Sequence, residues 1–196
     1  LKSLNYHYCP CKPITTITIL VKKTPKQLFL DHQRNASELR GKGGLPKRCV
    51  WLHNVRSMQN VGSIFRSSDA MAIDEVLLSG YTPCPPRPEI SKTALGAEEH
   101  VPWRFVEDPI SEIHKLQASD MKVIALEQTT SSQSILCDPP YSFHWCLLAG
   151  SETVGLEEEL LLEVDQTVHI DQYGMKHSLN VSVAVAIALH RLSFES

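Results

Sequence analysis

The sequence predicts an α/β fold, in which helices flank a largely parallel sheet, and three observations support this class. Short apolar runs alternate with segments of helical periodicity from residue 48 onwards, as they do in βαβ units. Hydrophobic residues make up 42% of the 196 residues, which is enough for one packed core. Polar segments follow four of the apolar runs, and in parallel sheets ligands bind beyond the carboxyl ends of the strands.

Each predicted element has a local signal. Residues 26–40 have the pattern of a short amphipathic helix, and residues 60–72 and 110–118 are also predicted to be helical. The segment 81–90 contains four prolines, which predicts an extended loop. Acidic residues in the early turns favour a helix at 155–164, because they complement the helix dipole. Strands are predicted at five apolar runs: residues 48–55, 75–80, 122–128, 144–151 and 166–170.

The C-terminal run 177–192 fits two kinds of secondary structure. Its large apolar residues occupy every second position, which is the pattern of a half-buried strand, and its β-branched content favours that interpretation. Apolar residues also recur every four positions from Val181 to Leu189, as in a helix. Ser178 or Asn180 can supply an oxygen that caps such a helix. The residues alone leave both structures open.

Charge divides the chain into two parts. Residues 1–48 carry ten Lys and Arg against two acids, a net charge of +8, whereas residues 49–196 carry nine against twenty, a net charge of −11. We expect a tail at residues 1–25 that need not be native, a basic helix or arm at residues 26–48, and one domain at residues 49–196. The basic residues of the arm either contact phosphates or form a solvated surface. They surround a Gly-rich joint: Arg34, Arg40, Lys42, Lys47 and Arg48.

The six cysteines are predicted to be reduced thiols of a cytoplasmic protein. The one close pair, Cys9 and Cys11, has no second pair that would complete a zinc site. Lone cysteines beside strand-like runs usually behave as small buried hydrophobes. No stretch approaches the roughly 18 apolar residues of a membrane span. We therefore expect neither a metal site nor a membrane segment.

Three polar motifs follow one another along the chain. They are NVRSMQNVGSIFRSSDA (residues 54–70), LLAGSETVGL (residues 147–156) and IDQYGMKHSLNVSVAVAIAL (residues 170–189). In this order they resemble the SpoU/TrmH branch of the SPOUT superfamily of RNA methyltransferases, over most of residues 50–192. A Thr-Ala-x-Gly-Ala loop at residues 93–97 is also similar to members of this family.

This resemblance implies a fold, a cofactor and partners. It implies a C-terminal deep trefoil knot, and therefore a helix at 177–192 that is buried in the knot and against a second subunit. It also implies S-adenosylmethionine (SAM) as methyl donor, a ribose 2′-hydroxyl of tRNA or rRNA as acceptor, and a homodimer whose RNA site draws on both subunits. By resemblance, SAM contacts are expected at Gly150, Ile170 and Leu179, with Leu126 and Gln172 beside them. Without the family, Ile170 and Leu179 are simply core residues.

The resemblance assigns the catalytic residues as Arg66, Asn60, Glu152, Ser178 and Asn180. We interpret Arg66 as a phosphate-binding group that lowers the pKa of the ribose hydroxyl, because a guanidinium with a pKa above about 12 is a poor base. Glu152 can orient Arg66 through a bidentate contact. Each of these residues also has a structural interpretation: a surface Arg, a solvated acid, or helix N-caps at Asn60, Ser178 and Asn180.

Two positions need separate comment. The family commonly has Pro after the isoleucine of the third motif, whereas this chain has Asp171, which is expected to place a carboxylate near the cofactor. The acidic run 157–159 is interpreted as a solvated helix face. The alternative function is a non-catalytic RNA-binding or assembly factor on the same fold, and a third is methylation of a base.

Overall fold

The computed structural model describes residues 22–24, 26–27, 46–137, 141–176 and 178–193. Residues 1–41 and 42–196 are separate units, and the sheet with its helices belongs to the second. Apart from residues 26–27, which are helical, the predicted helix at 26–40 and most of the basic arm lie outside the described residues. No helix among the described residues is long and apolar enough to cross a membrane.

Seven strands form one sheet, in the order β3-β2-β1-β6-β4-β7-β5. Every neighbouring pair in it is parallel, which confirms the predicted class. The strands are β1 (Arg48–His53), β2 (Glu75–Ser79), β3 (Trp103–Val106), β4 (Lys122–Leu126), β5 (Gln133–Ser134), β6 (Trp145–Ala149) and β7 (Gln166–His169). The five predicted strands are all present. The sequence analysis missed β3 and β5, because these strands are only four and two residues long and are partly exposed.

In the described part of residues 42–196, five helices lie between strands and a sixth follows β7: α2 (Met58–Ala70), α3 (Pro88–Ala94), α4 (Ala97–His100), α5 (Pro109–Ala118), α6 (Glu158–Glu163) and α7 (Val181–Ser193). The N-cap of α2 is Ser57, whose Oγ accepts a hydrogen bond from the backbone N of Asn60 at 3.2 Å. Asn60 is therefore not the cap of its own helix. In the run 177–192, which fitted either a strand or a helix, residues 181–192 belong to α7.

The predicted loops at 81–90 and 93–97 are partly wrong. The first loop ends where α3 begins at Pro88, because proline is favourable in the first turn of a helix. The second contains the end of α3 and the start of α4, separated by a sharp turn. Leu95 and Gly96 form this turn with φ angles of 54° and 90°.

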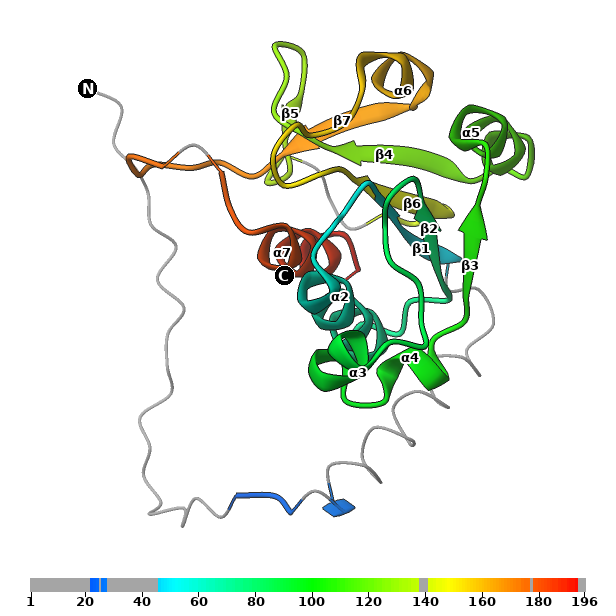
Figure 1. Cartoon of the computed structure of the whole chain (residues 1–196). Coiled ribbons are helices and arrows are strands. Elements are labelled where there is room, and N and C mark those ends of the chain that lie inside the picture. The colour runs from blue at the N-terminus through cyan, green and yellow to red at the C-terminus, as the bar shows by residue number, and fades with distance from the viewer. Residues whose placement is uncertain (1–21, 25, 28–45, 138–140, 177, 194–196) are drawn as a thin grey trace. The chain divides into compact units, whose positions relative to one another are not determined.

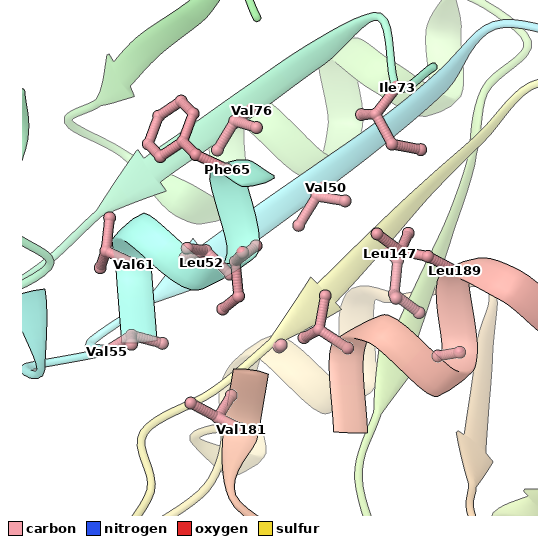
Figure 2. Packing of buried hydrophobic residues seen from close by; sticks show 14 of the residues in the cluster. Val50, Leu52, Val55, Val61, Phe65, Ile73, Val76, Leu147, Val181 and Leu189 are labelled. Carbon is pink, nitrogen blue, oxygen red and sulfur yellow. The ribbon is translucent and has the colours of Figure 1, made fainter. Parts of the chain in front are cut away.

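The sheet lies between two layers of helices. Helices α2, α3, α4 and α7 cover one face, and α5 and α6 cover the other (Figure 1). Side chains alternate between the faces along each strand, so that Val50 and Leu52 of β1 pack toward the first layer while Cys49 and Trp51 pack toward the second. Figure 2 shows the first core, in which residues of β1 and β6 meet those of α2 and α7.

Cys49 and Cys146 are adjacent in register on β1 and β6, and both are completely buried. Burial raises the pKa of the Cys49 thiol to about 12 and raises the pKa of Cys146 well above its ordinary value. Both thiols therefore stay protonated at neutral pH. This confirms their interpretation as small core residues.

Arg48 is the first residue of β1 and not part of an exposed basic cluster, so the prediction was wrong for this residue. It is 6% exposed, and its Nη2 donates to the carbonyl of Ala72 at 3.3 Å. Burial lowers the pKa of the Arg48 guanidinium, and the opposing effect of Asp74 is smaller. A side chain packed in this way is not available to phosphates.

Candidate cofactor cavity and catalytic residues

A cavity of about 300 Å³ opens at the carboxyl ends of β4, β6 and β7. Its walls come from four segments: residues 126–128, 149–155, 169–172 and 178–184. The five residues predicted for the cofactor all line it: Gly150, Ile170, Leu179, Leu126 and Gln172. Two of the predicted catalytic residues, Glu152 and Ser178, line it as well. The structure thus brings together segments that are distant in sequence, at the edge of the sheet where a ligand site was expected.

The second motif forms a narrow turn in the wall of this cavity. The backbone N of Ser151 donates to the carbonyl of Gly155 at 3.2 Å, and the N of Gly155 donates back to Ser151 at 3.0 Å. Gly155 has a φ of 72°, in the left-handed region that favours glycine. A Cβ at Gly150 would lie 2.6 Å from the carbonyl carbon of Gly155. Both motif glycines are therefore required by the shape of the turn.

Glu127 is a functional candidate that the sequence analysis missed. Its Oε2 accepts from the backbone N of Leu156 at 3.0 Å, and its Oε1 accepts from the N of Gln128 at 3.0 Å. The carboxylate lines the cavity and fastens the second motif to the end of β4. It lies near the end of the strand predicted at 122–128, and that position was its only signal in the sequence.

Three predicted catalytic residues form one hydrogen-bonded cluster. Asn60 Nδ2 donates to Glu152 Oε1 at 2.7 Å, and Asn180 Nδ2 donates to Asn60 Oδ1 at 3.1 Å. Asn180 Oδ1 also accepts from the backbone N of Ser182 at 2.9 Å, as the N-cap of α7 does. The cluster joins α2, the loop after β6 and the start of α7. Asn180 therefore caps α7 and also joins this cluster.

Arg66 lies apart from this cluster. It is an exposed residue of α2, six positions beyond Asn60, which is about 9 Å along the helix axis. Within the described part of the chain it forms no ion pair with Glu152, whose carboxylate binds Asn60 instead. The expected bidentate contact between Glu152 and Arg66 is therefore absent from this single chain.

Asp171 lies between Ile170 and Gln172, two residues of the cavity wall. It is not among the lining residues, and its Oδ2 accepts a hydrogen bond from Ser134 Oγ on β5. Its Oδ1 lies 3.6 Å from Nε2 of His169, which does line the cavity. These contacts constrain the chain after β7 in place of the rigidity that proline gives in the family.

The acidic run 157–159 is also more than a solvated face. Glu157 accepts from Asn54 Nδ2 at 2.8 Å through Oε1, and its Oε2 lies 3.1 Å from His53 Nε2. His53 Nδ1 lies 2.7 Å from Ser79 Oγ, which accepts from Trp51 Nε1. Glu157 therefore ties the start of α6 to the carboxyl ends of β1 and β2. No motif marks this network in the sequence.

The lining of the cavity favours a ligand that carries positive charge and no phosphate. Two carboxylates, Glu127 and Glu152, are present, and none of the described lining residues is Lys or Arg. The remaining lining is apolar side chains, backbone and neutral polar groups such as Gln172. Across the described residues, no group of three or more His, Cys, Asp or Glu could hold a metal ion.

Comparisons with known proteins show which family this chain matches. The model of the SpoU rRNA methylase family matches residues 47–190. The 23S rRNA (guanosine(2553)-2′-O)-methyltransferase RlmP of Bacillus subtilis is 30% identical over 148 residues, which are 74% of this chain and 58% of that protein. The tRNA (guanosine(18)-2′-O)-methyltransferase of Escherichia coli K12 is 28% identical over 145 residues, 74% of this chain and 62% of that protein.

A solved structure is similar over the same region. It is the AdoMet-bound rRNA methyltransferase from Sinorhizobium meliloti, with a TM-score of 0.70 and 28% identity over 74% of this chain and 55% of that one. The chain thus spans little more than half the length of these relatives.

Proposed function

Because this chain belongs to the SpoU rRNA methylase family, we propose that it transfers a methyl group from SAM to a ribose 2′-hydroxyl of tRNA or rRNA. The observation that carries this proposal is the cavity itself, in which residues of all three motifs or their direct partners meet at one edge of the sheet. The named activities of the relatives, 2′-O-methylation of guanosine in 23S rRNA and in tRNA, support it.

The residues of the cavity fit SAM. The volume of the cavity, about 300 Å³, is at the lower end of the range for small-molecule sites, roughly 300–1,000 Å³. SAM supplies a methyl group on a positively charged sulfur, and the lining offers carboxylates without an opposing Lys or Arg among its described residues. We propose that Gly150, Ile170 and Leu179 hold this cofactor, with Leu126 and Gln172 at its margin.

The catalytic proposal assigns positioning to most of the polar residues. Asn60, Glu152 and Asn180 hold three segments in one geometry, and Ser178 faces the cavity beside them. Fixed alignment of acceptor and donor supplies much of the acceleration in such a transfer. Arg66 binds the phosphate next to the target ribose and stabilises the 2′-oxygen, whose proton passes to solvent water.

We also propose that the C-terminal segment forms the trefoil knot of the family. Ile170, Gln172, Ser178 and Leu179 line the same cavity as residues 150–155, and this proximity supports the knot. The knot and the buried helix α7 would then both stiffen the wall of the cavity, because a threaded loop forms a stiff wall for a cofactor.

A homodimer completes the proposal. One side of α7 exposes two apolar side chains four residues apart, Val183 and Ile187, which are 48% and 42% exposed. A second copy of the chain that covers these side chains also provides a route for Arg66 to reach a cavity. We further propose that the basic arm contacts RNA phosphates and that the protein is cytoplasmic.

The direct test is methyl transfer in vitro. The purified chain is incubated with tritiated SAM and with tRNA and rRNA from cells deficient in methylation, and the RNA is then digested to nucleosides. We expect label in a 2′-O-methylnucleoside. Replacing Arg66 with Ala is expected to lower the rate by about 100-fold, the loss that follows removal of one transition-state donor. The matched control is Asp69→Ala, an exposed acid on the same helix.

The outcomes separate the alternatives. Calorimetric titration with SAM that gives no heat indicates a binding or assembly factor. Label in a methylated base indicates that the chain methylates a base and not a ribose. If Arg66→Ala retains near-normal activity while the wild type forms 2′-O-methylnucleosides, the role of Arg66 is wrong and the reaction class stands.

A further inference from the structure

We propose that the ring of Tyr81, with the guanidinium of Arg56 beside it, is a stacking platform for a nucleobase of the RNA substrate. Both residues lie in loops at the carboxyl edge of the sheet, Tyr81 after β2 and Arg56 after β1. Neither belongs to the cavity or to the cluster of Asn60. The proposal rests on the proposed function, because it concerns how the same RNA is bound.

The Tyr81 ring is presented to solvent and not packed in the core. The residue is 73% exposed, although the loop that carries it is anchored on both sides. The guanidinium carbon of Arg56 lies 5.6 Å from the centre of the ring, within the range of a cation–π contact. An exposed aromatic ring beside an exposed arginine combines a surface for stacking with a charge for phosphate.

The backbone under the ring is firmly held. The N of Tyr81 donates to Asn54 Oδ1 at 2.9 Å. Asn54 and Gly80 both have positive φ angles, 58° and 62°, and a Cβ at Gly80 would lie 2.0 Å from Asn54 Oδ1. Thr82 then accepts from the N of Val55 at 3.1 Å. These hydrogen bonds join the loops after β1 and β2, so the backbone that carries the Tyr81 ring is fixed.

Two hydrogen bonds, linked through neighbouring residues of the chain, join these loops to the wall of the cavity. Asn54 Nδ2 donates to Glu157 Oε1 at 2.8 Å. The neighbouring residue, Leu156, donates its backbone N to Glu127, which lines the cavity. The platform and the cofactor cavity thus share one edge of the sheet and one hydrogen-bonded support.

A nucleobase is the ligand that this pair fits best. Every base has an aromatic face, so a tyrosine ring can bind a base next to the methylated nucleotide without selecting its identity. The Arg56 guanidinium can meet a flanking phosphate while it contacts the ring. The platform therefore holds a nucleotide close to the target ribose, outside the cofactor cavity.

The test compares four variants of the full chain: Tyr81→Ala, Tyr81→Phe, Arg56→Ala and Arg56→Lys. Transcribed tRNA serves as substrate, with tritiated SAM, and calorimetry measures SAM binding. We expect Tyr81→Ala to raise the KM for RNA by about tenfold, with the Kd for SAM changed less than twofold. Tyr81→Phe keeps the ring and stays within about twofold of the wild type, because stacking does not need the hydroxyl.

Arg56→Ala weakens RNA binding, and Arg56→Lys restores part of it. Leu162→Ala, which removes a 77% exposed side chain on α6, is the surface control.

Cross-linking gives a second measurement that does not depend on turnover. The same tRNA transcribed with 4-thiouridine is irradiated with the wild type, and the cross-linked peptides are mapped. A cross-link at Tyr81 supports the platform even if no methylation occurs, in which case only the proposed function fails. If the wild type methylates RNA but Tyr81→Ala has an unchanged KM and no cross-link maps to residue 81, the platform is wrong.

Discussion

Gly155 is the residue on which the shape of the cofactor cavity depends most directly. Its φ of 72° closes the turn of the second motif, and a Cβ there would lie 2.3 Å from Glu127 Oε2. The same carboxylate oxygen accepts from the N of Leu156. A side chain at position 155 would therefore strain the backbone and displace the carboxylate that anchors the turn.

We predict that Gly155→Ala lowers the free energy of unfolding by about 1–3 kcal/mol and weakens SAM binding by at least about tenfold. Urea unfolding and calorimetric titration measure the two effects. Gly96→Ala is the matched control, since Gly96 also has a positive φ of 90° but a Cβ there would meet nothing within 4 Å. Equal loss of SAM affinity in both variants would contradict the role of the contact with Glu127.

At the scale of elements, α7 combines two surfaces. Its inner side buries Val181, Val185 and Leu189 against the sheet and α2, and its outer side exposes Val183 and Ile187. A helix that is apolar on nearly all sides must be covered on more than one of them. The described residues leave Val183 and Ile187 on the outer side exposed, which is why we assign that side to a second copy.

Replacing Val183 with Glu is therefore expected to shift the protein from dimer to monomer, because a carboxylate would be buried without a partner at the interface. Sedimentation equilibrium measures the association, and circular dichroism checks that α7 still folds. The control is Leu162→Glu, which places the same charge at a 77% exposed apolar position on α6. A wild type that is monomeric at micromolar concentration would refute the proposed dimer.

At the scale of the molecule, the carboxylate of Asp165 joins the start of β7 to β4. Asp165 precedes β7, and its Oδ2 accepts from the N of Val123 on β4 at 2.9 Å while its Oδ1 binds Lys122 Nζ at 3.0 Å. Desolvation raises the pKa of Asp165, but hydrogen bonds from Val123, Lys122 and Gln117 outweigh it and leave the pKa below its ordinary value. The ionised form is thus favoured in the folded state.

Asp165 should stabilise the fold most above its unfolded pKa of about 3.9, and this contribution should be lost as the pH falls through the lower, folded pKa. We expect Asp165→Asn to lose about 1 kcal/mol at pH 7 and to differ less from the wild type at pH 3. Urea unfolding at both pH values measures the difference, and Asp69→Asn, at an exposed position, is the control. A loss that is the same at both pH values would contradict the role of the ionised carboxylate.

The charge distribution of the whole chain leads to a prediction about salt. Residues 1–48 have a net charge of +8, and residues 49–196 have a net charge of −11, so we expect residues 1–48, which include the basic arm, to be the main source of attraction to RNA. We expect removal of residues 1–44 to weaken the binding of transcribed tRNA and to flatten its dependence on salt. Fluorescence anisotropy between 50 and 300 mM NaCl, roughly the range in which such contacts are screened, measures both. Lys115→Gln, at an exposed position on α5, is the control. An unchanged salt slope after truncation would refute the role of the arm.

The sequence by itself determined the class of the fold, five of the strands and the three motifs, because each depends on local patterns of apolar and polar residues. The alternating run at 177–192 was undecided from its residues, since the same side chains satisfy both periods. Only the resemblance to a family and the packing of α7 against α2 and the sheet selected the helix.

What the tertiary structure decided is which distant residues meet. Asn180 and Asn60 are 120 residues apart, and Asn54 and Glu157 are 103 apart. Their contacts follow from the order of the strands, in which β6 lies between β1 and β4. No local pattern encodes that order, because the apolar side chains of a strand do not specify which other strand lies beside it. For the same reason the partners of Glu127, Glu157 and Tyr81 were found only when the sheet was assembled.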